Sequence, residues 1–357
     1  MEAIFWLSAG LIAYVYAGYP LLLALWSAVA RRDPETPLDG ALPGVSVVIA
    51  ARNEACRLPA RIENLLASDY PLDRLQIIVA SDGSTDGIVD ALAPYARRVE
   101  LILLPPGGKA RALNAAVAHA AHPILVFADA RQQFAPDAIR RLVRHFARLS
   151  VGAVSGELVL DCERGAGRST VGDGIGAYWK YEKWLRRREA IVGSTLGVTG
   201  AIYAMRRSLW QPLPPDTILD DVLGPMRIVL RRHRVLFDAT ALAFDEAAAD
   251  AGAEARRKVR TLAGNFQLLA LEPRLLVPLV NPVWLQFVSH KVGRLLVPYA
   301  LVLLLAASAW LAAGSPLYAA ALAAQLAFYG LAAYGARLDR RERARSAPGR
   351  EVMREAA

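Results

Sequence analysis

Acidic and amide side chains follow three short apolar runs that have the β-branched composition of buried strands. Asn53 and Glu54 come after the first run, Asp82 after the second and Asp129 after the fourth. In an α/β sheet with parallel strands, the carboxyl ends of the strands meet at one edge, and ligands bind there. Carboxylates at such an edge can coordinate a divalent cation or act as general bases. The spacing therefore predicts one polar rim that carries the chemistry.

A glycine pair precedes Lys109 at the point where the third predicted helix begins. An ammonium group after glycines at a helix start is well placed to meet a phosphate. Asp82 also fits a simpler role, because Asp-Gly pairs form turns and Ser84 can cap the following helix. The combination of rim carboxylates with Lys109 favours a phosphate-bearing ligand over a set of unrelated turns.

Two nucleotide-binding motifs are absent from the sequence. No G-x-G-x-x-G follows the first strand, which disfavours a dinucleotide-binding fold, and the lack of G-x-x-x-x-G-K-[ST] disfavours a P-loop nucleotidase. The two cysteines, Cys56 and Cys162, have no metal-ligand spacing and suit a reducing compartment. The formal net charge of +9 fits a protein beside anionic lipid. No nucleic-acid partner is expected, because many of the basic residues adjoin the apolar ends of the chain.

The rim requires strands and helices in alternation. The predicted strands are 45–50, 75–80, 99–104 and 124–127, and the predicted helices between them are near 57–68, 86–96 and 109–121. This alternation predicts a doubly wound α/β sheet with right-handed crossovers. In the less regular second half, strands are expected at 151–160 and 197–205, with a long amphipathic helix at 173–190 between them.

Three uncharged runs, 4–30, 295–313 and 316–336, are long enough for helices that cross a bilayer. The first could instead be a signal peptide, but Glu2 precedes it and it exceeds a signal core of about 7–15 residues. Arginines follow the first and third runs, and basic flanks stay in the cytosol. We therefore expect a multi-pass protein of the inner (plasma) membrane whose central domain is cytosolic. The expected organisation is an anchor (1–30), a linker (31–44), a cytosolic domain (45–253), amphipathic interfacial helices (254–294), a transmembrane hairpin (295–336) and a basic tail (337–357).

The order of the rim motifs resembles that of family 2 inverting glycosyltransferases, in the membrane-bound polysaccharide-synthase branch. The motifs are Asn53-Glu54, Asp82-Gly83-Ser84-Thr85-Asp86, Gly108-Lys109-Ala110-Arg111-Ala112-Leu113-Asn114 and Phe127-Ala128-Asp129. The resemblance spans roughly residues 44–265 and rests on the order of the motifs more than on any one of them. It implies the type A glycosyltransferase fold, a Rossmann-like nucleotide-sugar domain, with one N-terminal and two C-terminal transmembrane helices.

The resemblance also implies a donor site. Asp82 would accept a hydrogen bond from the nucleobase, Asn53 and Glu54 would lie near the nucleoside, and Lys109 would help to hold the donor. Asp129 matches the first acid of the family's D-x-D motif, which binds the ribose–diphosphate and its divalent metal, Mg²⁺ or Mn²⁺. Leaving-group charge grows as the glycosidic bond breaks, and such cations neutralise it.

Later motifs imply the catalytic base. Leu219-Asp220-Asp221 matches the family's T-E-D, whose last carboxylate takes the proton of the acceptor hydroxyl, so that Asp221 is the expected base and Asp220 lies on the acceptor side. Both acids also fit the first turn of a helix without catalysis. Arg260 lies where the family's Q-x-x-R-W places an arginine against the donor diphosphate.

Two departures from the family pattern concern the metal and the acceptor. Arg131 stands where a second acid is common, and it could pair with the diphosphate directly. Thr261 replaces the tryptophan that stacks on the acceptor in processive synthases, which weakens the case for polymerisation. On the acceptor side, Trp179 could form a sugar platform or only pack a helix against sheet or bilayer. Gly200 could form a tight acceptor loop or mark a strand bend.

The expected function is transfer of a sugar from a nucleotide-sugar donor, with UDP-sugars as the leading candidates. The acceptor would be a saccharide or a lipid-linked compound at the cytosolic membrane face, in polysaccharide or glycolipid synthesis. The alternative is a non-catalytic membrane subunit that binds a nucleotide sugar within a polysaccharide assembly. Arg131 and Thr261 favour this alternative.

Overall fold

A computed structural model describes residues 1–30, 42–161, 170–246 and 251–346. Most of the predicted linker 31–44, Cys162 and the end of the predicted tail 337–357 lie outside these described residues. The chain divides into two compact units, one formed by Met1–Tyr19 with Val292–Ala357 and the other by Pro20–Lys291.

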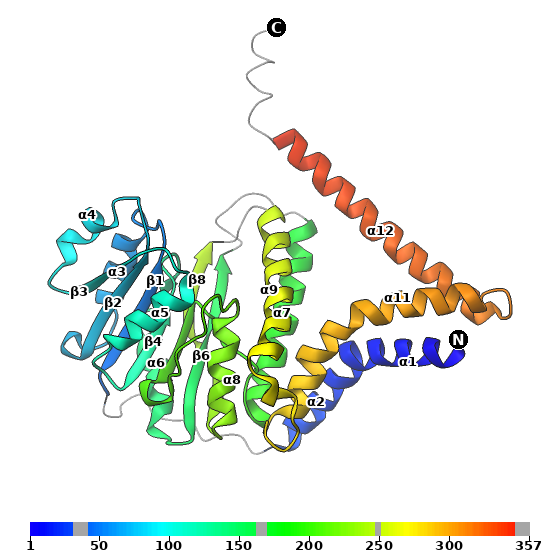
Figure 1. The fold of residues 1–357 in the computed structure, drawn as a ribbon, viewed down its shortest axis with the longest axis horizontal. Coiled ribbons are helices and arrows are strands. Elements are labelled where there is room, and N and C mark those ends of the chain that lie inside the picture. The colour runs from blue at the N-terminus through cyan, green and yellow to red at the C-terminus, as the bar shows by residue number, and fades with distance from the viewer. Residues whose placement is uncertain (31–41, 162–169, 247–250, 347–357) are drawn as a thin grey trace, which may run out of the picture. The chain divides into compact units, whose positions relative to one another are not determined.

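The larger unit contains one eight-stranded mixed sheet in the order β3-β2-β1-β4-β7-β6-β8-β5 (Figure 1). The strands are β1 (Val45–Ala51), β2 (Leu75–Asp82), β3 (Val99–Leu104), β4 (Ile124–Ala128), β5 (Gln133–Phe134), β6 (Val151–Asp161), β7 (Ile202–Arg206) and β8 (Arg234–Glu246). The first four strands pair in parallel, which confirms the predicted doubly wound half. β7 is antiparallel to both β4 and β6, and β8 is parallel to β6.

The order of the strands creates a switch point between β1 and β4. The chain moves outward from β1 to β2 and β3, and then returns past β1 to β4 through α5. Because right-handed crossovers in opposite directions place their helices on opposite faces, α5 covers the face that α3 and α4 leave open. Ligands in open α/β sheets bind beyond the strand ends at such a switch point. The helices of this unit that surround the sheet are α3 (Leu58–Leu66), α4 (Ile88–Leu92), α5 (Lys109–Ala118), α6 (Ala138–Val143), α7 (Thr170–Val192), α8 (Asp220–Leu230) and α9 (Ala251–Leu271).

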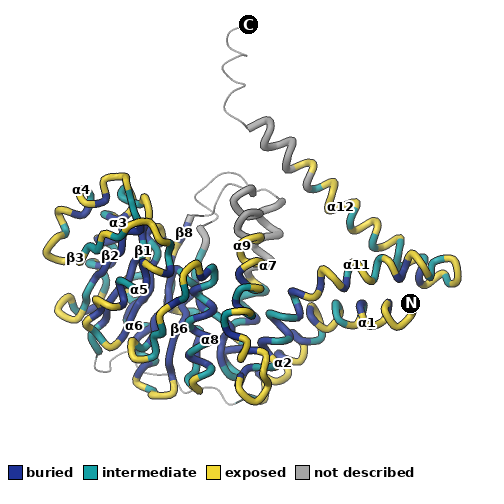
Figure 2. Tube along the Cα trace, in the orientation of Figure 1, coloured by how far each residue is buried: buried dark blue, intermediate teal, exposed yellow. Residues whose placement is uncertain are grey.

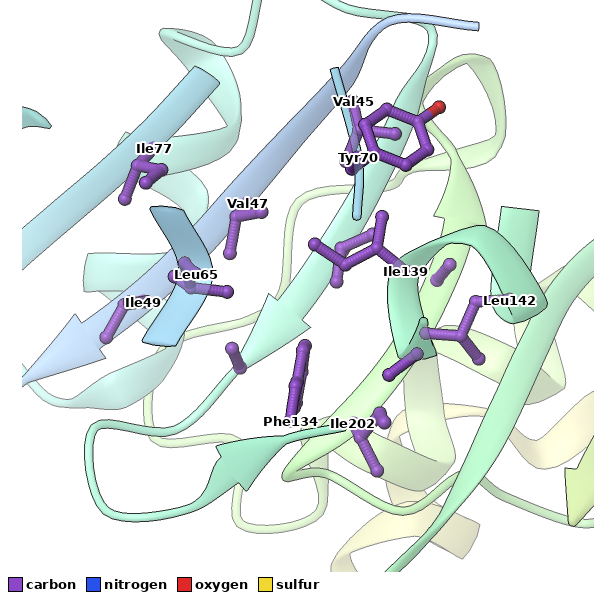
Figure 3. Packing of buried hydrophobic residues seen from close by; sticks show 14 of the residues in the cluster. Val45, Val47, Ile49, Leu65, Tyr70, Ile77, Phe134, Ile139, Leu142 and Ile202 are labelled. Carbon is purple, nitrogen blue, oxygen red and sulfur yellow. The ribbon is translucent and has the colours of Figure 1, made fainter. Parts of the chain in front are cut away.

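Alternate residues of the central strands form a continuous apolar core with α3 and α6 (Figure 3). Val47, Leu65 and Ile139 are each fully buried in it, on a strand and two different helices. Val48, the neighbour of Val47, is also fully buried because the opposite face is covered too. Burial of each such side chain contributes about 1.5–3 kcal/mol, so the parallel strands are fixed from both sides and the rim stands on a rigid support.

The second half of the sheet departs from the sequence-based prediction. β8, of 13 residues, was not predicted, because its polar start at Arg234 resembles a solvated charge run. Arg234 instead donates hydrogen bonds to the carbonyls of Ala190 and Gly193. The strand predicted at 197–205 begins only at Ile202, because the residues before it form a turn.

Three helices are long and apolar enough to cross a membrane: Glu2–Val29, Trp284–Leu311 and Pro316–Gly335. The first comprises α1 (Glu2–Ala13), a π-helical turn η1 (Tyr14–Gly18) and α2 (Tyr19–Val29), and the second comprises α10 (Trp284–Gln286), a π-helical turn η7 (Phe287–Val292) and α11 (Gly293–Leu311). The third lies in α12 (Pro316–Ser346). Residues 284–294, which the sequence assigned to interfacial helices, are thus continuous with the second apolar helix.

Within the smaller unit, α1, α11 and α12 share a small apolar contact. The ring of Phe5 meets that of Tyr318 edge-on, with centroids 4.9 Å apart, and Ala307 is fully buried beside them. Long stretches of these helices are exposed (Figure 2). The exposed large apolar side chains include Leu7 and Trp310, at 75% each. Such contiguous apolar exposure is typical of helices solvated by lipid.

Candidate active site

Lys109 joins two of the predicted site carboxylates. Its Nζ lies 3.5 Å from Asp129 Oδ1, beyond the end of β4, and 3.4 Å from Asp220 Oδ2, at the start of α8. Burial opposes the ammonium charge, but the carboxylates of Asp220, Asp129 and Asp221 outweigh it and raise the pKa of Lys109. Residues that are up to 112 positions apart in the sequence, from Lys109 to Asp221, therefore meet in one electrostatic cluster. This is the convergence that the predicted rim requires.

Asp82 shapes the loop that presents Lys109. Its carboxylate accepts hydrogen bonds from the backbone N–H groups of Gly107, at 2.6 Å, and Gly108, at 3.0 Å. Gly108 has a φ of 87°, which a residue with a side chain rarely adopts, and it directly precedes α5. Asp82 is 5% exposed. The structure thus gives this carboxylate a loop-holding role in addition to the predicted contact with the nucleobase.

Asn53 and Glu54 belong to a loop that is tied to the loop after β2. The Asn53 side chain accepts a hydrogen bond from the Thr85 N–H at 2.9 Å, and the Asn53 N–H donates to Ser84 Oγ at 3.0 Å. Asn53 has a φ of 56°, a left-handed conformation that asparagine tolerates well. Glu54 accepts a hydrogen bond from Arg57 at 2.6 Å. Both residues lie on the rim, beside the carboxyl ends of β1 and β2.

Asp221 sits against the turn that precedes β7. Its carbonyl accepts the Val198 N–H at 2.8 Å, and a Cβ built on Gly200 would lie 3.5 Å from Asp221 Oδ2. Burial and the neighbouring charge of Asp220 raise the pKa of Asp221, while the charges of Lys109, Lys291 and Arg186 oppose the shift. A raised pKa makes a carboxylate a better proton acceptor at neutral pH. The structure therefore places Gly200 and Asp221 together, on the side of the cluster away from β1.

The loop that leads into Asp220 and Asp221 is held by α9. The Ile218 N–H donates to Gln267 Oε1 at 2.9 Å, and Gln267 Nε2 donates to the Asp216 carbonyl at 2.9 Å. Gly264 allows the close approach, because a Cβ there would lie 2.6 Å from Leu219 Cγ. Neither contact was predicted from the sequence, although a glycine inside a helical run is a signal of close packing.

Arg131 and Arg260 are the two remaining predicted donor residues. Arg131 pairs with the buried Asp245 of β8 at 2.5 Å, and Gln132 donates to the same carboxylate at 2.9 Å. The Arg131 guanidinium is therefore held by Asp245, a carboxylate that was not singled out from the sequence. Arg260 is exposed on α9, one turn before Gly264, and makes no ion pair within the described part of the chain. Trp179 lies in α7, and its side chain is outside the described residues.

The residues around Asp129 fit a divalent cation that is shared with a donor. Its carboxylate is 39% exposed, and its contact with Lys109 at 3.5 Å is longer than the about 2.7–2.9 Å of a tight charged hydrogen bond. The described residues contain no cluster of three or more His, Cys, Asp or Glu side chains that could cage a metal. An ion such as Mg²⁺, which keeps several non-protein ligands, suits a single carboxylate of this kind.

Comparison with known proteins agrees with this geometry. The family model described as "Glycosyl transferase family 2" matches residues 46–211, from β1 to beyond β7. Residues 46–211 form a family 2 glycosyltransferase domain. The mixed sheet with its parallel half is the type A glycosyltransferase fold, as predicted from the motif order.

Several known proteins are similar to this chain over part or most of its length. The structure of the mannosyltransferase PcManGT from Pyrobaculum calidifontis, in complex with GDP-Man and Mn²⁺, superposes with a TM-score of 0.70 at 27% identity and covers 92% of both chains. A beta-monoglucosyldiacylglycerol synthase from Nostoc sp. is 32% identical over 138 residues, which are 37% of this chain and 30% of that protein. A poly-beta-1,6-N-acetyl-D-glucosamine synthase from Staphylococcus aureus is 22% identical over 251 residues, which are 67% of this chain and 58% of that protein. The chain therefore spans about a third to somewhat over half of these two synthases.

Proposed function

We propose that this glycosyltransferase moves a sugar from a nucleotide-sugar donor to a saccharide or lipid-linked acceptor, with inversion at the anomeric carbon. The cluster of Lys109 with Asp129 and Asp220, adjoining Asp221, carries the proposal. UDP-sugars are the proposed donors, and GDP-mannose, the sugar nucleotide bound in the archaeal structure, is the second candidate. The products would serve glycolipid or polysaccharide synthesis, as the names of the related synthases suggest.

The residues of the cluster divide the reaction between them. Asp221 takes the proton of the acceptor hydroxyl as its oxygen attacks the anomeric carbon, and the nucleoside diphosphate leaves from the opposite face. A positioned base of this kind contributes on the order of 10²–10⁴-fold in rate. Lys109 places a positive charge where negative charge grows on the leaving oxygen. A divalent cation held by Asp129 and the donor phosphates would supply further charge neutralisation.

A donor panel tests the proposal directly. The full chain in detergent, with Mg²⁺ or Mn²⁺, is incubated with UDP- and GDP-sugars and an alkyl glycoside, and released nucleotide is measured. Nucleotide release with one donor, abolished by a chelator and restored by added metal, is expected. Tight donor binding by calorimetry without turnover on any donor would instead favour the non-catalytic membrane subunit.

The membrane orientation is proposed from the arginines that follow the first and third apolar runs. These basic flanks support a glycosyltransferase domain on the cytosolic face of the inner membrane. Cys56 is exposed on the domain, so it reports the orientation in a Cys162→Ser background. A membrane-impermeant maleimide should label Cys56 in inverted vesicles and not in intact spheroplasts, and the reverse pattern would contradict the proposed orientation.

A further inference from the structure

The segment 197–200, which precedes β7, lies directly against the proposed base. The Val198 N–H donates a hydrogen bond to the Asp221 carbonyl at 2.8 Å. A Cβ built on Gly200 would lie 3.4 Å from Asp221 Cβ and 3.5 Å from Asp221 Oδ2, and its three nearest atoms all belong to Asp221. These are ordinary van der Waals distances. A side chain at position 200 would therefore cover the carboxylate without a clash, and the glycine leaves that place free.

The place left free at Gly200 suits the carbon atom next to a reacting hydroxyl. A hydroxyl that gives its proton to a carboxylate lies about 2.6–3.2 Å from the accepting oxygen. The carbon that carries this hydroxyl is one bond further away, at a distance from Oδ2 similar to the 3.5 Å of the absent Cβ. Water has no such carbon. A side chain at position 200 would thus compete with an acceptor alcohol and leave room for water.

Thr199 fastens the segment 197–200 to two other elements. Its N–H donates to Ser155 Oγ of β6 at 2.8 Å, and the oxygens Ser155 Oγ and Thr199 Oγ1 share a hydrogen bond at 3.2 Å. Arg186 Nη1 of α7 donates to Thr199 Oγ1 at 3.1 Å. Ser155 is fully buried in the sheet. Since Gly200 has no side chain of its own, the contacts of Thr199 set where its backbone lies.

The two ends of the segment are fixed by other hydrogen bonds. The Thr195 N–H donates to the Val235 carbonyl of β8 at 3.0 Å, and Thr195 Oγ1 donates to the Gly197 carbonyl at 2.8 Å. At the other end, the Ile202 N–H donates to the Thr199 carbonyl at 2.9 Å. Loss of the Thr199 hydroxyl should therefore leave the ends in place and release the middle, which is the part that adjoins Asp221.

We propose that the segment 197–200 selects the acceptor over water as the molecule that receives the sugar. Thr199 is the positioning residue that holds the segment, and the hydroxyl-bearing carbon of the acceptor packs on Gly200 beside Asp221. This inference rests on the proposed glycosyltransferase function and deepens it on the acceptor side.

Transfer and hydrolysis share one chemical step. An oxygen attacks the anomeric carbon, the bond from that carbon to the diphosphate oxygen breaks, and the nucleoside diphosphate leaves. Asp221 takes the proton of the attacking oxygen in both cases. The attacking molecule alone differs, since an acceptor alcohol yields a glycoside and water yields the free sugar. The ratio of the two products therefore reports acceptor selection separately from the competence of the base.

This product ratio tests the proposal in the full chain. The protein in detergent receives a donor labelled in its sugar and an alkyl glycoside as acceptor, and the glycoside product and free sugar are counted separately. Thr199→Val keeps the shape of the side chain without its hydroxyl and should raise the ratio of hydrolysis to transfer about tenfold, because small misplacements of reacting groups cost rate on at least this scale. Thr199→Ser should restore the wild-type ratio. Gly200→Ala should raise the ratio at least as much, mainly through the acceptor KM.

Gly224→Ala is the matched control, because Gly224 lies on α8 with Asp221 and a Cβ there would meet nothing within 4 Å. This variant should keep the wild-type ratio. A purely structural role predicts equal losses of transfer and hydrolysis in Thr199→Val and Gly200→Ala, and that result would overturn the inference. A Thr199→Ser variant as impaired as Thr199→Val would also overturn it, as would a donor KM that rises as much as the acceptor KM.

The wild-type protein separates failure of this inference from failure of the proposed function. Its hydrolysis of the donor should fall when the alkyl glycoside is added, because the acceptor displaces water. Hydrolysis that continues undiminished, without glycoside formation, would overturn acceptor selection while leaving the enzyme a nucleotide-sugar hydrolase. If the wild-type protein releases nucleotide from no donor at all, the proposed function itself has failed.

Discussion

Replacing Asp221 with asparagine removes the proposed base while keeping the size of the side chain. We expect sugar transfer to fall by about 10²–10⁴-fold, or about 2.7–5.4 kcal/mol of transition-state stabilisation. Asp220 is unable to substitute, because its Oδ2 is engaged by Lys109 at 3.4 Å. The proposed donor contacts at Asp129 and Asp82 are untouched, so donor affinity should change by no more than a few-fold. Asp216→Asn, an exposed acid on the same loop, is the matched control and should retain full activity.

The pH dependence provides an independent readout of the same carboxylate. Burial and Asp220 raise the pKa of Asp221, and the base works only when ionised, so wild-type kcat should fall as the pH drops through that raised value. The Asp221→Asn variant should lose this acid limb. A raised carboxyl pKa also means that the ionised form costs folding stability at neutral pH, so the variant should unfold at no lower a temperature than wild type. Initial rates from pH 4 to 9 (about the stable range of most proteins) test the loss of the acid limb. Donor calorimetry tests whether donor affinity is retained. Transfer within tenfold of wild type, or equal losses of transfer and donor binding, would refute the assignment.

Three further predictions follow from individual contacts. Lys109→Met should raise donor KM at least tenfold, because it removes the cation that joins two carboxylates and is proposed to meet the diphosphate. A donor titration measures this change in KM. Gly264→Ala places a Cβ 2.6 Å from Leu219, so it should cost about 1–3 kcal/mol in stability. It should also lower kcat more than donor affinity. Denaturation and rate measurements test these two effects. Burial opposes ionisation of Asp238, but hydrogen bonds from His145 and Thr240 outweigh it and hold the pKa of Asp238 below its usual range. The ionised carboxylate therefore contributes to folding stability above pH about 4, and this contribution is lost as the pH falls. Asp238→Asn should therefore destabilise the fold by about 1–3 kcal/mol at pH 7, and by less at pH 3, in urea titrations.

The parallel half of the fold was readable from the sequence because its strands are buried on both faces. Such strands appear as short runs rich in β-branched residues, as in Val45–Ala51. The later strands gave weaker signals. β8 mixes polar residues such as Asp238 and Asp245 with apolar ones, since these acids are paired with side chains from other elements, His145 and Arg131. A pairing of this kind leaves no local trace in the sequence.

The sequence alone determined which residue types stand at the strand ends and how many apolar helices flank the domain. Local chemistry decides both, because strand runs, turns and hydrophobic stretches are properties of neighbouring residues. Only the tertiary structure decided that Lys109 joins Asp129 to Asp220, that Arg131 is held by Asp245, and that α9 supports the loop of Asp221. These contacts form between segments that are far apart in the chain, so they depend on sheet order and helix packing, which no short stretch of sequence specifies.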